Sequence, residues 1–209
     1  PNLDALLAEY GMTRQEGLVI ENDSNYYAYR YPQTYLLPSL SSNDITAGIT
    51  DGMHVFTPVA QGIVKGDSTD DLTLTTLLST SSTAYSMQDY AEATTAEQGA
   101  NDPNGPFNIA VAASNSATGA KVVWVNCPNM LNSQMNSAVS GGNAQLLTSA
   151  VNWMTGEENG VVIDSKSMSA ETLTVPAKAT MMLGLLFTIV VPLAFIVAGI
   201  AITLVRRRR

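Results

Sequence analysis

The chain has 209 residues and a formal net charge of −8, with ten Lys and Arg against eighteen Asp and Glu, and it contains one cysteine. An acidic surface of this kind disfavours nucleic acid as a partner, and a single cysteine excludes an intrachain disulfide framework. The roughly 175 residues that precede the final apolar segment are enough to bury a core without such links.

The first half of the chain predicts short helices and strands. Leu3, Leu6, Leu7 and Tyr10 recur at helical spacing, and Gly11 follows them as a stop signal, so the chain begins with a helix. Apolar or β-branched runs predict strands further on, and a Ser/Asn/Asp start with a Gly end predicts one more short helix. The predicted strands are "GLVIEN", "MHVFTPVAQGIVKG" and "DLTLTTLLSTSSTAYSM", and the predicted second helix is "SSNDITAGITDG".

Five of the eight tyrosines crowd into ten residues between these elements. Pro32 and Pro38 interrupt this segment, which favours an extended, edge-like or loop path. Exposed tyrosines of this kind suit a surface that recognises a partner or a glycan, whereas ordinary packing of half of them over a sheet edge is the favoured explanation. The tyrosines are Tyr26, Tyr27, Tyr29, Tyr31 and Tyr35.

The second half opens with an acidic loop at residues 88–105, which lacks an apolar period and is predicted to be mobile. Two apolar segments, "PFNIAVAASN" and "GAKVVWVNCP", predict buried strands, the second of the type found in parallel sheets. The strongest predicted helix, "GGNAQLLTSAVNWMTGEE", carries one apolar stripe through Ala144, Leu147, Val151 and Met154 and a second beside it. "NGVVIDSKSM" and "ETLTVP" predict a last strand and a connection.

The chain ends in an uncharged apolar segment that predicts a membrane anchor. From Met181 to Val205 there is no charged residue, and a helix of this length covers the hydrocarbon core of about 30 Å. Pro192 lies within the span and removes one backbone donor, which a neighbouring helix, the hydroxyl of Thr188 or a local kink must compensate. Small residues offer a face on which another helix can pack: Ala194, Ala198 and Ala201.

The flanks of this segment predict its orientation. Four arginines, Arg206, Arg207, Arg208 and Arg209, follow it, whereas Lys178 is the one basic residue close to the other side. The excess of positive charge on the cytoplasmic side then places the C-terminus in the cytoplasm and the main domain outside the cell membrane. The expected organisation is an extracytoplasmic α/β domain at 1–176, a juxtamembrane segment and membrane helix at 177–205, and a basic tail at 206–209.

The residues offer little catalytic or metal-binding chemistry. Cys127 follows a predicted strand, but Pro128 lacks the backbone N–H that a nucleophile elbow supplies to an oxyanion, and His54 lies far away in sequence. One His and one Cys do not build a common zinc site, and no phosphate-binding glycine loop is present. The acidic turns "GDSTDD" and "NDPNG" resemble calcium loops in composition but do not fit their spacing. We therefore expect no enzyme activity and no cofactor, and leave calcium binding open.

Several segments together resemble the GldG family, the gliding-motility-type auxiliary components of ABC transport systems. The resemblance runs over most of the chain in the order "PNLDALLAEYGM", "GPFNIAVAA", "KVVWVN" and "NAQLLTSAVNWMTGEENGVVI", followed by the apolar span and basic residues. It implies a Rossmann-like, class I glutamine-amidotransferase-like α/β domain. Relative to the family, the chain is expected to lack the early strands and glycine-rich turn of that domain.

The resemblance also implies the partners. A family member works beside an ABC permease and, through it, a cytoplasmic ATPase, as a non-enzymatic subunit whose outer domain aids substrate handling or coupling. The alternative is a free-standing surface protein that binds or senses a ligand and uses the helix as a tether in the membrane lipid. The transported substrate and its direction do not follow from the residues.

Overall fold

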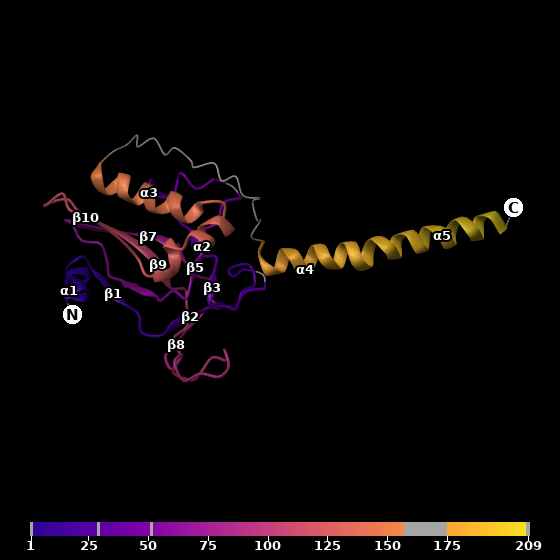
Figure 1. Ribbon diagram of the computed structural model, residues 1–209, viewed down its shortest axis with the longest axis horizontal. Helices are drawn as coiled ribbons and strands as arrows, with labels where there is room; N and C mark the ends of the chain where they lie inside the picture. Colours follow the sequence, from indigo (N-terminus) through magenta and orange to yellow (C-terminus); the bar gives the residue numbers. More distant parts are fainter. Residues whose placement is uncertain (1, 29, 51, 157–174, 208–209) are drawn as a thin grey trace.

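The computed structural model describes residues 2–28, 30–50, 52–156 and 175–207. It shows a domain of strands and helices, from which one long helix projects at the C-terminal end (Figure 1). The mixed α/β character expected from the sequence is confirmed.

The core of the domain is a six-stranded antiparallel sheet. Its order is β1 (Met12–Arg14), β6 (Ile63–Lys65), β9 (Asn108–Asn115), β7 (Leu72–Ser79) and β4 (Ser39–Leu40), and β10 (Lys121–Val125) also pairs with β9. Two smaller antiparallel sheets pair β2 (Leu18–Ile20) with β8 (Tyr85–Met87), and β3 (Tyr35–Leu36) with β5 (Thr57–Pro58).

The predicted parallel pairing of the segment that forms β10 is wrong. β9 and β10 form a hairpin in register from Ala110 opposite Val125 to Ser114 opposite Lys121. Its turn is closed by the Asn115 amide, which donates to the Ala120 carbonyl at 2.8 Å, and a connection this short permits only antiparallel strands. The apolar run predicted a buried strand, but β10 is only half-buried, with Lys121 exposed and Val122, Val123, Trp124 and Val125 intermediate.

The predicted short helix at 41–52 is also wrong, because this segment forms turns. The side-chain oxygen of Asn43 accepts from the amides of Ile45 and Thr46, at 3.0 and 3.2 Å, and the Thr46 hydroxyl donates to the Ser41 carbonyl at 2.5 Å. These local side-chain bonds replace a helical ladder, which is the usual way in which Asn and Thr compete with helix formation.

Helices cover both faces of the central sheet. On one face, α3 (Gly142–Thr155) packs over the largest hydrophobic cluster, with Leu146 and Ala150 buried. On the other, α1 (Asn2–Glu9) contributes Leu7 to a cluster that includes Trp124 at its margin. A 3₁₀ turn, η1 (Pro128–Leu131), and α2 (Ser133–Ala138) connect β10 to α3. The result is a layered domain with α1 and α3 on opposite sides (Figure 1).

The buried stripe of α3 differs from the main predicted one. Val151 and Met154 are exposed by 52% and 37%, and the buried residues belong to the neighbouring stripe. Both stripes are apolar, and the entry of the helix selects between them. A Cβ on Gly142 would lie 2.1 Å from the His54 carbonyl oxygen, so the backbone approaches this loop as only glycine allows.

Asn143 holds the same entry point from inside the domain. Its side-chain oxygen accepts from the Phe56 amide at 2.7 Å, and its amide group donates to the carbonyls of Phe56 and Met130 at 2.9 and 3.0 Å. The side chain is 1% exposed, so these bonds satisfy backbone groups that water does not reach. They fix α3 to the β5 segment and to η1.

Candidate functional site

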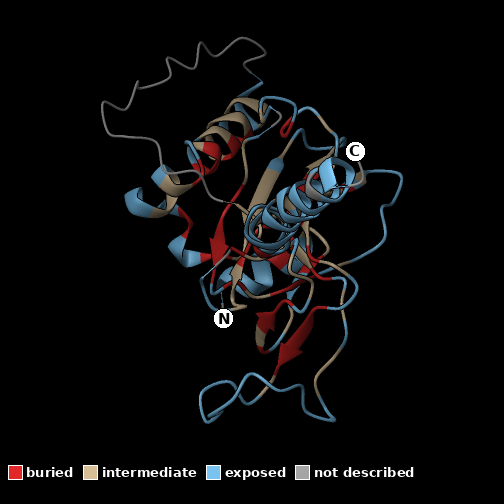
Figure 2. Cartoon of the chain, turned by 90° about the vertical axis from the view of Figure 1, so that its right-hand side faces the viewer, coloured by how far each residue is buried: buried red, intermediate tan, exposed pale blue. Residues whose placement is uncertain are grey.

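The described C-terminal part of the chain forms one continuous helix. It runs over Ala177–Arg207 through α4 (Ala177–Leu185), a π-helical segment η2 (Leu186–Val190) and α5 (Val191–Arg207), and it is long and apolar enough to cross a membrane. The side chains of residues 181–190 are all exposed, and Figure 2 shows the helix in the colour of exposed residues along its length. Exposed apolar side chains over so many turns are typical of a helix surrounded by lipid.

The helix rearranges locally just before Pro192. The Val191 amide donates to the Leu186 carbonyl, one residue further back than in an α-helix, which places a π segment directly ahead of the proline. Pro192 itself has no N–H to donate, so the helix ladder must be interrupted near this point. Of the three forms of compensation expected from the sequence, the structure shows the change in the helix itself.

The residues with predicted packing and topology roles belong to this helix, and these roles stay predictions. Ala194, Ala198 and Ala201 lie on one side of α5 by their spacing of four and three residues and are exposed. Arg206 and Arg207 end the helix, whereas Arg208 and Arg209 lie outside the described residues.

The base of the helix is joined to the domain by backbone contacts with residues 24–37, which hold the five clustered tyrosines and are called the tyrosine segment. Ala28 and Pro176 form an antiparallel bridge, and the Lys178 amide donates to the Ser24 carbonyl at 3.4 Å. Ala177 is 3% exposed, so the first residue of the helix is packed against the domain. In Figure 1 the segment lies beside the start of α4, at the end of the domain from which the helix leaves.

The tyrosine segment folds back on itself next to this junction. The Leu37 amide donates to the Tyr26 carbonyl at 2.7 Å, and Tyr27 pairs with Leu36 in an isolated bridge. The segment is extended or looped around its prolines, as predicted, with β3 and β4 as its ordered parts.

The described tyrosine rings are packed to different degrees, and their role as a partner surface stays a prediction. Tyr35 lies 5.8 Å from the buried ring of Phe56, which is sheet-edge packing. Tyr31 stacks on Tyr35 with ring centroids 5.1 Å apart, yet it remains 45% exposed. Tyr26 and Tyr27 are half-buried, and Tyr29 lies outside the described residues. Tyr31 also packs edge-on against Phe56, with ring centroids 5.7 Å apart, so its ring is partly packed and partly exposed.

Cys127 is a buried thiol with 6% exposure. Its Sγ donates to the Pro58 carbonyl at 3.2 Å, and burial raises the pKa of the thiol from 9.0 to about 11. The thiolate that a nucleophile requires is therefore disfavoured at neutral pH. The backbone of His54 lies against Gly142, and no hydrogen bond links its imidazole to Cys127 in the part of the chain that the structure describes.

The acidic loop at 88–105 is exposed at its tip and tied together at its base. The Asp102 carboxylate accepts from the amides of Gln88 and Gly99, at 2.9 and 2.8 Å. The Tyr85 hydroxyl donates to the Ala96 carbonyl, and burial, with Asp102 and Glu97 nearby, raises the pKa of this phenol. Across the described residues, no group of three or more His, Cys, Asp or Glu side chains is placed to hold a metal.

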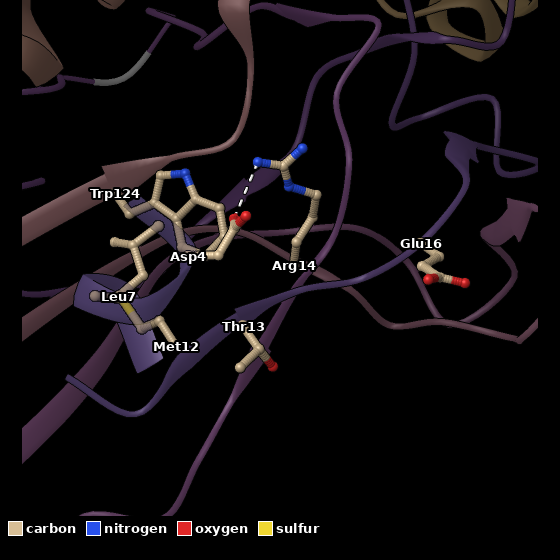
Figure 3. Close-up of a pocket in the computed structure, with 7 residues that line it drawn as sticks. All are labelled: Asp4, Leu7, Met12, Thr13, Arg14, Glu16 and Trp124. Carbon is tan, nitrogen blue, oxygen red and sulfur yellow. Dashed lines mark hydrogen bonds and ion pairs between the residues drawn. The ribbon is translucent and has the colours of Figure 1, made fainter. Parts of the chain in front are cut away.

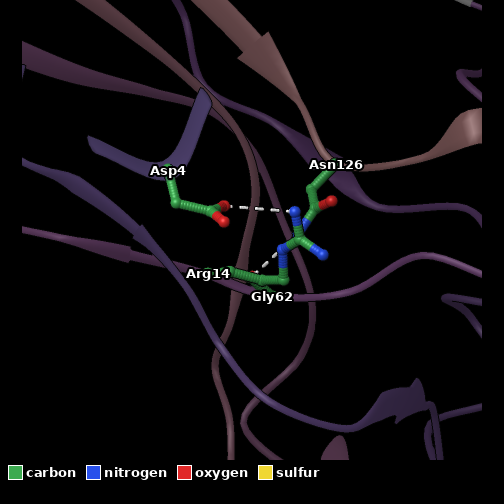
Figure 4. A network of polar contacts seen from close by, with 4 residues as sticks. All are labelled: Asp4, Arg14, Gly62 and Asn126. Carbon is green, nitrogen blue, oxygen red and sulfur yellow. Dashed lines mark hydrogen bonds and ion pairs between the residues drawn. The ribbon is translucent and has the colours of Figure 1, made fainter. Parts of the chain in front are cut away.

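A shallow hollow of about 300 Å³ lies at the opposite end of the domain, between α1 and the sheet edge (Figure 3). Arg14 donates to Asp4 across it at 3.2 Å, with both side chains about half exposed, and Trp124 forms part of its wall. Beside it, the side-chain amide of Asn126 donates to the Gly62 carbonyl at 3.1 Å (Figure 4). An exposed pair of this kind contributes little binding or stabilising energy, so the hollow is a minor candidate.

Sequence reasoning missed a buried carboxylate. Glu21 is fully buried at the end of β2, where it accepts from the amides of Asp23 and Ser81 at 2.9 and 3.0 Å and from the Ser81 hydroxyl at 2.6 Å. Three donors compensate the loss of hydration that burial imposes on the carboxylate. The group links β2 to the turn between β7 and β8, and no local motif marks a contact between residues so far apart in sequence.

No family model and no curated protein matches the chain. Among solved structures, the chain is similar to the mmIFT52 N-terminal domain, with a TM-score of 0.50 and 16% sequence identity. The match covers 77% of this chain and 59% of that structure, so the chain spans less than two thirds of its length. At this identity the likeness shows the arrangement of the fold alone.

Proposed function

We propose that the chain is a non-enzymatic, membrane-anchored auxiliary subunit of an ABC transporter. In this proposal the helix Ala177–Arg207 crosses the cell membrane, the main domain is extracytoplasmic, and the arginine tail is cytoplasmic. The observation that carries the proposal is the junction at Ala177, where an apolar helix of membrane-spanning length begins in direct contact with the domain.

The junction favours a subunit whose domain is held in a defined orientation relative to the helix. It argues against a helix that is only a passive tether. Backbone bonding at Ala28 and Lys178 restricts how the domain tilts relative to the helix. A domain held in this way presents a defined surface to a permease, and coupling to a permease requires such a surface. The resemblance to the GldG family supplies the identity of the partners, an ABC permease and its cytoplasmic ATPase.

The Rossmann-like, amidotransferase-like fold is part of the same proposal and rests on that resemblance. Such folds have mainly parallel sheets, and the strand pairs in the described residues are antiparallel. The antiparallel sheet therefore adds no support to the family assignment, which rests on the order of the matching segments along the chain.

Copurification from native membranes tests the proposal. A tagged chain should retain the permease after detergent extraction, and Ala198→Phe should weaken this retention several-fold by filling the small-residue face. Ile196→Phe is the matched control, since residue 196 lies on the opposite side of α5. If none of these chains retained the permease, the result would favour the alternative, a free-standing surface protein that binds or senses a ligand.

A further inference from the structure

The tyrosine segment and the base of the helix are in backbone contact, and we call a set of their exposed and half-buried residues the collar. It consists of Tyr26, Tyr27, Arg30, Tyr31 and Lys178. The bridge between Ala28 and Pro176 and the Lys178–Ser24 backbone bond hold its two parts together. Whatever surrounds the start of the helix therefore also surrounds the collar.

The position of the collar along the helix places it at a particular depth. Pro176 and Lys178 precede the uncharged span, which begins at Met181, by five and three residues. At 1.5 Å per helical residue, these contacts lie about 5 to 8 Å outside the start of the span. The headgroup layer on each side of the hydrocarbon core has about the same thickness.

The chemistry of the collar differs from that of the rest of the domain. Residues 1–205 carry six basic and eighteen acidic residues, a formal charge of −12, because four of the ten basic residues are the terminal arginines. Yet Arg30 is the only charged residue between Ser24 and Asn43, and Lys178 is the only one from Thr172 to Val205. Where its helix begins, the acidic chain is thus poor in acids and rich in tyrosine. This region carries two cations, Arg30 and Lys178, and one neighbouring acid, Asp23, whose carboxylate accepts from the Asn25 backbone amide at 2.9 Å.

We propose that the collar is a lipid-contacting surface that lies in the headgroup layer of the membrane that holds the helix. Tyrosine concentrates at this level because its ring is apolar and its hydroxyl is polar, and Arg and Lys are attracted to anionic headgroups. The half-exposed ring of Tyr31 supplies the amphipathic contact. The collar sets the tilt of the outer domain, while the acidic remainder stays clear of the lipid surface.

This inference rests on the proposed anchoring, so its test must separate the two. The full chain, in a Cys127→Ser background, is reconstituted into vesicles of zwitterionic and anionic phospholipid with one nitroxide label per protein. The labels are attached through Asn25→Cys directly beside the collar, Ile189→Cys in the span and Asp70→Cys as the remote control. Asp70 precedes the far end of β7, about 25 Å of strand away from Ser79, which pairs with Ser39 beyond the tyrosine segment.

Collision of each label with a water-soluble nickel reagent and with oxygen reports its depth. We expect nickel collisions at residue 25 to be at least threefold fewer than at residue 70, with residue 189 the most protected. Tyr31→Ser should raise collisions at residue 25 about twofold, and Tyr90→Ser, which removes a similarly exposed tyrosine from the acidic loop, should not. Arg30→Gln should raise the nickel collisions at residue 25 more in anionic vesicles than in zwitterionic ones.

Two results overturn different claims. Equal nickel collisions at residues 25 and 70, with residue 189 still protected, would overturn the lipid-contacting collar and leave the anchor intact. A water-accessible label at residue 189 would overturn the anchor and the collar with it.

Discussion

Ala28 and Pro176 form an antiparallel bridge that joins the tyrosine segment near the start of the chain to the residue that precedes the apolar helix. The next two residues along the chain are also held: Ala177 is 3% exposed, and the Lys178 amide donates to the Ser24 carbonyl. The helix is therefore part of the domain at its base.

This junction predicts a specific crosslink. In the chain carrying Ser24→Cys and Lys178→Cys, a short bis-maleimide reagent should join the two positions efficiently in membranes, because their backbones are hydrogen-bonded at 3.4 Å. The chain carrying Asp70→Cys and Lys178→Cys is the control and should give no product. Mass spectrometry of the digested protein identifies the linked peptides. Equal yields from both pairs would show that the helix base does not dock on the tyrosine segment.

Asn143→Ala should destabilise the domain that precedes the long helix. The substitution leaves the buried Phe56 amide and two carbonyls without their partners, which lowers the free energy of unfolding by about 2 to 4 kcal/mol. Urea unfolding of the detergent-solubilised chain, followed by tryptophan fluorescence, measures this change. Asn129→Ala, on an exposed residue, should alter it by less than about 0.5 kcal/mol. Equal effects of the two substitutions would contradict the role of Asn143 in holding α3.

Cys127→Ser should retain copurification with the permease, because the thiol is buried and protonated at neutral pH. Its high pKa also gives the stability a pH dependence. Below pH 9 the thiol is protonated in both states; between pH 9 and 11 only the unfolded chain releases the proton, so unfolding becomes easier as pH rises. This contribution amounts to about 2 to 3 kcal/mol and should be missing in Cys127→Ala.

Urea unfolding of wild type and Cys127→Ala at several pH values measures this contribution. The difference between the two chains cancels the effects of the other titrating groups. Rapid reaction of the native thiol with a maleimide at pH 7.5 would contradict its burial. Loss of permease binding in Cys127→Ser, with stability unchanged, would restore a functional role for the residue.

The local sequence signals predicted much of the fold. Apolar periodicity found α1 and α3, and β-branched runs found β7 and β9, because these elements bury residues at the spacing of their own secondary structure. The uncharged run from Met181 predicted the long helix in the same way. The predicted last strand at 159–168 lies outside the described residues, and so does the predicted connection at 171–176 apart from Val175 and Pro176.

The junction and the buried polar contacts depend on residues far apart in sequence. Neither the pairing of Ala28 with Pro176 nor the bonding of Glu21 to Ser81 leaves a local pattern, because either partner alone resembles an ordinary loop residue. Tertiary contact also decided the buried side of α3, where Gly142 and Asn143 fix how the helix enters. The tyrosines were noticed from the sequence, but their position beside the helix required the structure.

The small-residue face predicts a helical pattern of contacts within the membrane. Single cysteines scanned from Leu193 to Ile202 should crosslink to the permease with maxima near Ala194, Ala198 and Ala201 and minima near Ile196. The physical reason is that alanines allow the backbone of a neighbouring helix to approach closely. A flat profile would reduce the helix to a plain anchor and move the docking surface to the outer domain.

The topology of the chain in cells tests the central claim most directly. A protease site placed in the exposed loop at 88–105 and an epitope tag fused after Arg209 are followed in intact cells treated with protease from outside. The account predicts cleavage at the loop, with the tagged fragment remaining in the membrane and its tag protected until the cells are broken. A protected loop together with a removed tag, or a chain that alkaline carbonate releases from the membrane, would contradict it.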